Sequence, residues 1–405
     1  GAGIAKIATN GITGDLAIST AGLTQAEING LLGKASTAAN VTVDAVGMTS
    51  DELEVLHTNI TKIDSITNAT LEDDETDAEI GSILSKATDA LVDADSMSIL
   101  DLTAVADNMS GVKALGISNL TLTSDQSVDE ISALMGTATA DDSVAVVATG
   151  MSALQLNAVA AEIAEVGAIT GDLTGLTSGV TASDIAILFG QYTGNTATVL
   201  ATGMTSAQLT AIDAGDVAAD GVTGTFTVAS DVASAQINAV LAKTATGATV
   251  TVNAATMDAA QKGVVEDNIA KVDTLTNLTL ASGEDATEIA ALLNVAGAGS
   301  VSVDATGMVA AQLAAIHDAA GAADSGAGIA KIATNGITGD LAISRTGLTE
   351  IEMNGLLGKA STAANVTVDA NNMSTTELQD LHDNIARIDS ITNATVTTTE
   401  EAAEI

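Results

Sequence analysis

Three histidines are the side chains of this sequence best suited to acid–base chemistry, because an unperturbed imidazole titrates near neutral pH. They stand nine residues after a methionine and are His57, His317 and His382. The corresponding positions elsewhere in the chain hold Ala106, Ala160, Asp213 and Glu266. A general acid or base that catalysis requires would not alternate with alanine. We therefore expect surface or groove histidines and no catalytic site.

The methionines that precede these positions form a second recurring set. They are Met48, Met97, Met151, Met204, Met257, Met308 and Met373. Thioethers bind soft metals, but a flexible side chain at a regularly repeated corner is more typical of core filling. We expect core methionines.

An acidic run could hold Ca²⁺. It comprises Glu72, Asp73, Asp74 and Glu75, followed by Asp77 and Glu79. The sequence contains neither an EF-hand loop nor a calcium-binding nonapeptide, and the related stretch 397–402 reads TTTEEA. We expect a solvated patch beside a helix N-terminus. No cofactor is expected, although loosely bound Ca²⁺ stays open.

A recurring set of hydroxyl and carboxylate side chains is the candidate interaction face. The threonines are Thr42, Thr70, Thr121, Thr174, Thr198, Thr227, Thr251, Thr279 and Thr367. Beside them run Asp44, Asp93, Asp304 and Asp369, with Asn253 in the same series. We expect a near-continuous hydroxyl ladder, which would suit glycans, O-glycosylation, neighbouring molecules or ordered water. The alternative is that threonine simply fits an exposed pleated surface.

The composition argues against several other classes of function. The formal net charge of −40 opposes phosphate backbones, so no nucleic-acid partner is expected. There is no Cys, which excludes disulfides and thiol chemistry. We find no apolar run long enough to cross a bilayer, so no membrane insertion is expected. Asn-x-Ser/Thr sequons recur along the chain, among them those at Asn40, Asn59, Asn68, Asn108, Asn119, Asn277, Asn365 and Asn393.

The elements that position these side chains come from two nested repeats. The nineteen residues 1–19 return unchanged as 326–344, so residues 1–325 form one long repeat and 326–405 begin the next. The chain therefore reads as a section of something longer. Within the long repeat, segments such as ITNATL at Ile66 and VTVDAVGM ending at Met48 alternate, giving twelve half-units of about 26 residues.

Each half-unit predicts a strand and then a helix. Val41–Ala45 alternates apolar and polar residues, as a half-buried strand does. Capping boxes then mark helix starts, at Thr24/Glu27, Thr49/Glu52, Ser127/Glu130, Ser152/Gln155, Thr205/Gln208, Thr349/Glu352 and Ser374/Glu377. Such short units can bury their apolar faces only by stacking. The expected fold is an α/β right-handed solenoid, with a parallel sheet on one side and helices on the other.

Two resemblances follow. LTNLTL at Leu275 resembles the strand of leucine-rich repeats, although the asparagine that follows that strand is not kept. The ITNATL, VTVDATGM and capping-box blocks resemble those of giant tandem-repeat cell-surface proteins of marine cyanobacteria and related bacteria. That resemblance implies an extracellular or cell-surface structural protein, self-associating or packed against neighbouring rods, without catalysis. The alternative is an adhesive module that uses the Thr/Asp face for glycans, surfaces or neighbouring rods.

Overall fold

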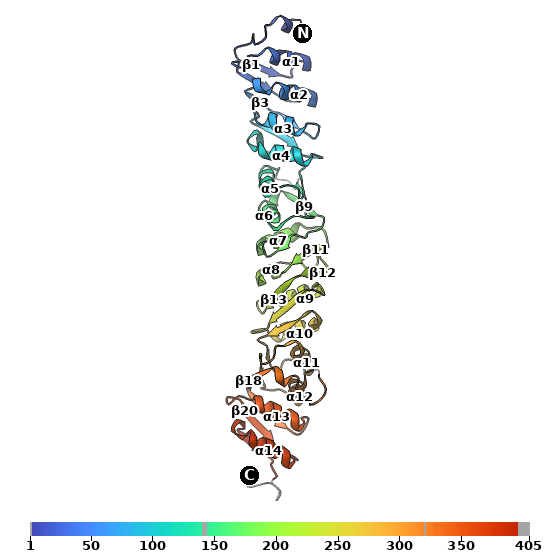
Figure 1. The fold of residues 1–405 in the computed structure, drawn as a ribbon, viewed down its shortest axis with the longest axis vertical. Coiled ribbons are helices and arrows are strands. Elements are labelled where there is room, and N and C mark those ends of the chain that lie inside the picture. The colour runs from blue at the N-terminus through green and yellow to red at the C-terminus, as the bar shows by residue number, and fades with distance from the viewer. Residues whose placement is uncertain (1, 140–143, 320, 396–405) are drawn as a thin grey trace. The chain divides into compact units, whose positions relative to one another are not determined.

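The computed structural model describes residues 2–139, 144–319 and 321–395. The fold is α/β, with short parallel strands alternating with short helices (Figure 1). The chain divides into two compact units, one of Gly1–Val199 with Gly215–Ala218 and one of Leu200–Ala214 with Ala219–Ile405. The expected boundary between residues 325 and 326 lies inside the second unit.

Helices follow one another in chain order within each unit (Figure 1). The first unit holds α1 (Gln25–Lys34), α2 (Ser50–Thr58), α3 (Asp77–Leu84), α4 (Ile99–Asp107), α5 (Val128–Met135), α6 (Ala153–Ala161) and α7 (Ala182–Gln191). The second holds α8 (Ser206–Thr210), α9 (Ser234–Ala242), α10 (Ala259–Asp267), α11 (Ala286–Val295), α12 (Ala310–Asp318), α13 (Glu350–Lys359) and α14 (Thr375–Asp383). Single 3₁₀ turns are η1 (Ile4–Lys6), η2 (Ile60–Lys62), η3 (Met109–Gly111), η4 (Ile163–Glu165), η5 (Ile269–Lys271), η6 (Ile329–Lys331) and η7 (Ile385–Arg387).

Strands pair in parallel and in groups of three. In the first unit these are β1 (Leu16–Ser19), β2 (Val41–Asp44) and β3 (Ser65–Thr67); β4 (Thr70–Leu71), β5 (Ala90–Asp93) and β6 (Val112–Ser118); and β7 (Thr121–Leu122), β8 (Val144–Val147) and β9 (Val166–Thr170). A further group consists of β10 (Leu176–Thr177), β11 (Ala197–Leu200) and β12 (Val217–Thr223), and residues of β11 and β12 are divided between the two units. The second unit has β13 (Thr225–Ala229), β14 (Thr249–Asn253) and β15 (Thr274–Thr276); β16 (Thr279–Leu280), β17 (Val301–Asp304) and β18 (Ile332–Thr338); and β19 (Asp340–Ser344), β20 (Asn365–Asp369) and β21 (Ser390–Thr392). No described sheet closes into a barrel.

The helix starts confirm the capping boxes. All seven predicted pairs are present at helix N-termini, including Thr24 with Glu27 and Ser374 with Glu377. In each box the acid or amide at the third helical position accepts the N-cap N–H, which the helix itself leaves unpaired. These boxes fix where each helix begins relative to the strand before it.

The core consists of small aliphatic side chains from strands and helices. In β2 the exposed fraction of Val41 is 0% and that of Val43 is 1%, while Thr42 and Asp44 point outward and are exposed. Four of the recurring methionines (Met151, Met204, Met257 and Met308) are buried, which confirms core filling there. Within the described residues, no helix is long and apolar enough to cross a membrane.

One feature of the strands differs from the expectation. The segment from Ser65 to Leu71 is not a single strand, because Asn68 between β3 and β4 has a left-handed backbone with φ of +54°. β3 therefore pairs with the strand before it, and β4 pairs with the strand after it. The same break recurs at a position that we call the hinge position, at Asn68, Asn119, Gly171, Gly224, Asn277, Gly339 and Asn393.

Candidate functional site

The candidate residues lie on the outward face of the strands, except Thr174, which precedes β10. The exposed members are Thr42, Asp44, Thr70, Thr121, Thr174, Thr227, Thr279, Asp304 and Thr367, and the half-buried ones are Asp93, Thr198, Thr251 and Asp369. None of these side chains is buried, because successive strand residues point to opposite faces of the sheet.

The prediction of a near-continuous hydroxyl ladder is wrong. Thr42 lies beside Ala17 and Ser65, and Thr70 lies beside Leu91, so these two threonines belong to different sheets. The left-handed hinge causes this, since it moves the chain from one three-stranded group to the next. A row made only of threonine occurs in the sheet of β13, β14 and β15, where Thr227, Thr251 and Thr274 lie side by side.

A shallow hollow of about 340 Å³ lies over the outward face of β1, β2 and β3. Its lining residues are Ala17, Ile18, Ser19, Thr42, Val43, Asp44, Ser65 and Thr67. Hydroxyl groups and one carboxylate therefore converge on one face, which is the chemistry that hydrogen-bonds to sugars.

Three of the four aspartates of this face, and Asn253 in the same series, are engaged by the following coil, where a coil means one strand with the helix after it. The Nδ2 atoms of hinge asparagines donate to them: Asn68 to Asp44 (2.9 Å), Asn119 to Asp93 (2.8 Å), Asn277 to the Oδ1 of Asn253 (3.0 Å) and Asn393 to Asp369 (2.8 Å). Sequence reasoning counted these asparagines only as sequons and missed their role. The signal was available, because a position restricted to Asn and Gly indicates a left-handed backbone.

Where glycine occupies the hinge, a different contact joins the coils. A threonine two residues beyond the Asp/Asn position accepts the N–H of the residue after the glycine: Thr149 from Asp172 (2.8 Å), Thr202 from Thr225 (3.0 Å) and Thr306 from Asp340 (3.1 Å). A Cβ on Gly171, Gly224 or Gly339 would come within 2.6 Å of these hydroxyl oxygens. In coils with an asparagine hinge, the threonine position holds Val46, Asp95, Ala255 and Asn371. Each hinge type thus matches the coil before it.

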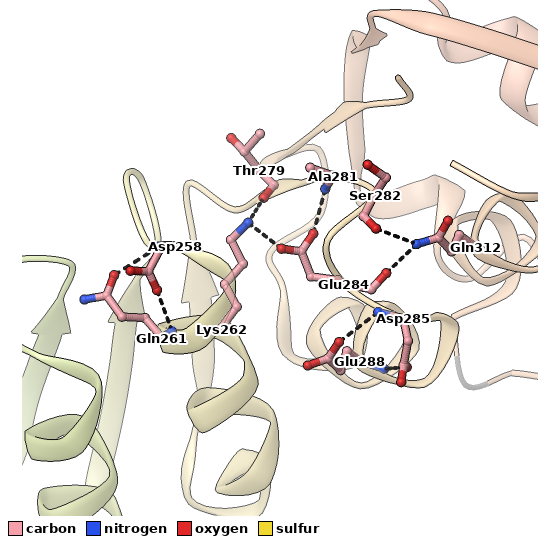
Figure 2. Close-up of polar contacts among 10 residues, drawn as sticks. All are labelled: Asp258, Gln261, Lys262, Thr279, Ala281, Ser282, Glu284, Asp285, Glu288 and Gln312. Carbon is pink, nitrogen blue, oxygen red and sulfur yellow. Dashed lines mark hydrogen bonds and ion pairs between the residues drawn. The ribbon is translucent and has the colours of Figure 1, made fainter. Parts of the chain in front are cut away.

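A second polar layer lies where strands turn into helices (Figure 2). Gln312, the third residue of α12, accepts the Val309 N–H and donates to the carbonyls of Ser282 and Glu284 in the preceding coil. Gln261 donates in the same way to Ser230 and Val232. One glutamine therefore caps its own helix and fastens it to the previous coil.

The same layer contains a buried ion pair. Lys262 Nζ lies 2.9 Å from Glu284 Oε1 and donates to the Thr279 carbonyl at 2.6 Å (Figure 2). Their side chains are 8% and 2% exposed. The Ala281 N–H donates to the other Glu284 oxygen at 2.6 Å, so both carboxylate oxygens have partners.

The acidic run departs from expectation at one residue. Glu72, Asp73 and Asp74 are exposed, but Glu75 is only 5% exposed. Burial raises the pKa of Glu75 above its ordinary value, with the charges of Glu72 and Asp74 adding to the effect and a hydrogen bond from the Glu72 amide opposing it. The expectation of a solvated patch is therefore wrong for Glu75. This residue occupies the same corner between strand and helix as Glu284, which pairs there with Lys262. The related stretch 397–402 lies outside the described residues.

The histidines occupy three different settings. His57 Nδ1 lies 2.7 Å from Ser82 Oγ, and His382 is half-buried. His317 is 3% exposed, lies 2.7 Å from Asp318 and lines a hollow of about 450 Å³ with Glu350, Ile351, Asn354, Gly355 and Asp380. Burial raises the pKa of Asp318, but hydrogen bonds from His317 and the Asp324 amide outweigh it and leave that pKa lowered. Among the described residues, no three or more His, Asp or Glu side chains are grouped to hold a metal.

Comparison with known proteins gives no relative. No protein-family model matches the chain, and no curated protein matches it. Among solved structures, the yeast Rad7–Elc1 complex is similar over 85% of this chain and 73% of that chain, at 10% identity and a TM-score of 0.16. A putative dihydrodipicolinate synthase family protein from Coccidioides immitis is similar over 37% of this chain and 50% of that one, at 14% identity and a TM-score of 0.14.

Proposed function

We propose that this chain is a structural repeat segment of a very large exported cell-surface or extracellular filament protein, without catalysis of its own. Its coils of about 26 residues would stack as a right-handed solenoid, since a strand–crossover–parallel strand connection is nearly always right-handed. The repeated sequence blocks and the repeated contacts between coils both support this proposal.

The observation that carries the proposal is that polar side chains are used repeatedly to join one coil to the next. Asparagines bond to each other 30 residues apart on the helix side, as Asn59 to Asn29 (3.2 Å), Asn268 to Asn238 (3.0 Å) and Asn384 to Asn354 (3.1 Å). The hinge contacts do the same on the strand side, and the capping glutamines do it at the corner. A repeat whose polar groups serve stacking suits a structural element.

Charge and composition support an exported setting. A net charge of −40 keeps repeated surfaces soluble and apart. The absence of Cys makes the chain independent of the redox state around it. Loosely bound cations, Ca²⁺ among them, would balance the charge.

Deletion of whole coils tests the structural proposal. Removing Glu72–Leu122 joins Leu71 to Thr123, two equivalent places, since the Glu72 N–H bonds to Glu75 as the Thr123 N–H bonds to Gln126. We expect a folded chain whose maximum dimension, by small-angle X-ray scattering, shortens by about 10 Å, or two strand spacings. Deleting Glu72–Met109 breaks the phase and should prevent cooperative folding. Equal behaviour of both deletions, or an unchanged dimension, would overturn the proposal.

The hollow over β1–β3 favours a second candidate, adhesion to polysaccharides through the strand face. Lysines at Thr42, Thr198 and Thr251 would obstruct that face. The matched control places lysines at Ala26, Ala78 and Ala260, which are exposed on helices. If the face is adhesive, only the strand-face variant loses retention on immobilised neutral or acidic polysaccharides. Equal retention of both variants rejects adhesion through this face.

A further inference from the structure

The hollow beside His317 contains an acceptor atom that the protein does not use. Asp318 Oδ1 lies 2.7 Å from His317 Nδ1. Because an ionised carboxylate can only accept a hydrogen bond, the proton of the neutral imidazole is on Nδ1 and the lone pair is on Nε2. Only 3% of the His317 side chain is exposed, and no described residue hydrogen-bonds to Nε2. The atom is therefore a buried acceptor without a protein partner.

Gly355 keeps the Nε2 edge of the ring open to the hollow. A Cβ on Gly355 would lie 2.7 Å from Nε2 and 2.5 Å from Cδ2 of His317, so a larger side chain would press against the ring. The coil of His57 shows the filled alternative. There Ser82 stands at the position equivalent to Gly355, and its Oγ lies 2.7 Å from His57 Nδ1. The ring of His57 thus meets a protein hydroxyl, whereas the free edge of His317 meets the hollow.

Two carboxylates make the hollow electrically negative. Glu350 has no hydrogen-bond or ion-pair partner among the described residues, and Asp380 accepts one long hydrogen bond, from Asn354 Nδ2 at 3.3 Å. Burial raises the pKa of Asp380, and the charges of Asp383 and Glu377 add to the effect. The described residues that line the hollow include no lysine or arginine. A cation in the hollow would therefore stabilise both carboxylates.

A primary alkylammonium ion matches these groups. It carries one positive charge and three N–H donors, and the hollow offers three acceptors in His317 Nε2, Glu350 and Asp380. Ile351 also lines the hollow and is 54% exposed, so it provides apolar surface for an alkyl stem. A metal ion needs its ligand atoms at about 2.0–2.6 Å. No three described His, Asp or Glu side chains are grouped to hold one.

We propose that the hollow formed by α12, α13 and α14 binds a primary alkylammonium group, with His317 Nε2, Glu350 and Asp380 as its acceptors. The group belongs either to a free amine or to the lysine side chain of a protein. This inference goes beyond the structural role proposed above, because a stacking element has no need of an open acceptor.

The three histidines of the chain allow the site to be observed directly. The full chain is labelled with ¹⁵N at histidine and titrated with n-butylammonium at about pH 8, where an alkylamine is protonated and an ordinary imidazole is neutral. We expect a saturable shift of the His317 Nε2 resonance and no shift of His57. Tetramethylammonium has the same charge but no N–H donor, so it measures general attraction to a chain of net charge −40. A shift with Nα-acetyl-lysine amide as well assigns the site to protein lysines, and a shift with butylammonium alone assigns it to free amines.

The other copy of the repeat supplies substitutions for the test. Gln25 and Ala26 stand where this copy has Glu350 and Ile351. Glu350→Gln with Ile351→Ala should therefore fold, and it should weaken butylammonium binding by about tenfold or more, the usual loss for a hydrogen bond between charged groups. Glu54→Gln is the matched control, because it removes an equal charge from an exposed position of α2 and should leave binding unchanged.

A second variant fills the hollow. Gly355→Ser should abolish the shift of His317, since Ser82 fills the equivalent place beside His57. The proposal is overturned if butylammonium and tetramethylammonium shift His317 equally. It is also overturned if Glu350→Gln with Ile351→Ala binds as tightly as the original chain, a result that decides the question even where the serine variant does not fold. A shift of His317 with Zn²⁺ and none with butylammonium would assign the hollow to a metal instead.

Discussion

At the scale of single residues, the corner between strand and helix is filled in some coils by charged side chains and in others by apolar ones. Lys262 and Glu284 form a buried ion pair there, whereas the corresponding positions two coils earlier hold Leu209 and Val232, both buried. Removing two charges from water costs several kcal/mol per ion, and their attraction offsets that cost only in good geometry. The pair is therefore one of two ways to fill the same space.

Exchange of the pair for its apolar equivalent tests this balance. Lys262→Leu alone should destabilise the second unit by about 3–5 kcal/mol, because it leaves the Glu284 carboxylate buried without a cation. Lys262→Leu with Glu284→Val, which matches Leu209 and Val232 and leaves the net charge unchanged, should be neutral or stabilising by about 1–4 kcal/mol. Urea unfolding monitored by circular dichroism measures both. A double variant as unstable as the single one would contradict this account.

Glu75 gives stability a pH dependence of defined sign. Burial raises its pKa in the folded state, so the folded chain binds the proton more tightly than the unfolded chain. Stability is then highest below the ordinary glutamate pKa and declines as pH rises through the raised value. Glu75→Gln should remove this decline and raise the melting temperature at neutral pH. Thermal melts from about pH 4 to about pH 8 measure it.

The coil two after that of Glu75 supplies its control. Gln126 occupies the equivalent corner and accepts the Thr123 N–H at 2.7 Å, as Glu75 accepts the Glu72 N–H at 2.7 Å. Gln126→Glu should introduce a decline in stability with rising pH. If neither substitution changes the pH profile, burial of the Glu75 carboxyl does not govern stability.

At the scale of elements, the hinge between consecutive strands sets the register of the sheets. It needs a left-handed backbone, which costs an ordinary L-residue about 1–2 kcal/mol and which glycine and asparagine tolerate. The chain meets this need either with an asparagine that bonds to the Asp/Asn position or with a glycine beside a threonine. The two solutions do not mix among the described hinges.

Converting one hinge type into the other tests whether glycine hinges depend on the threonine of the preceding coil. Asn277→Gly loses the bond to Asn253 but keeps the backbone, so it should cost about 0.5–1.5 kcal/mol. Adding Ala255→Thr supplies the hydroxyl of the glycine type and should recover part of that loss. Asn277→Ala should cost about 1–2 kcal/mol more than the glycine variant. A double-mutant cycle by chemical denaturation measures the coupling, and strictly additive effects would contradict the pairing of Gly with Thr.

The local parts of the fold could be predicted from the sequence, because they depend on neighbouring residues. Capping boxes located seven helix starts, and period-two alternation located strands such as Val41–Asp44. The hydroxyl ladder failed because register depends on backbone dihedrals at Asn68, which spacing alone does not reveal. The burial of Glu75 was missed because its neighbours Glu72, Asp73 and Asp74 are exposed, and an acidic run looks uniform in sequence.

At the scale of the whole molecule, electrostatic repulsion makes the stability of the fold depend on salt concentration. With 52 acidic and 12 basic residues, self-repulsion opposes compaction, and salt screens it. We expect the melting temperature to be lowest at low ionic strength and to rise with added Na⁺ or, at lower concentration, Ca²⁺. Differential scanning calorimetry across a salt series measures this. A melt independent of salt would show that repulsion is negligible.

The reach of the contacts between coils has a consequence for synthesis. Asn68 bonds back 24 residues to Asp44, and Asn268 bonds back 30 residues to Asn238. Each coil can therefore dock as soon as its own residues have left the ribosome, because the coil before it, which supplies its partners, has already been made. Folding time would then follow the rate of translation and not the total length of the chain, so repeated duplication could lengthen such a protein without creating a slower folding problem.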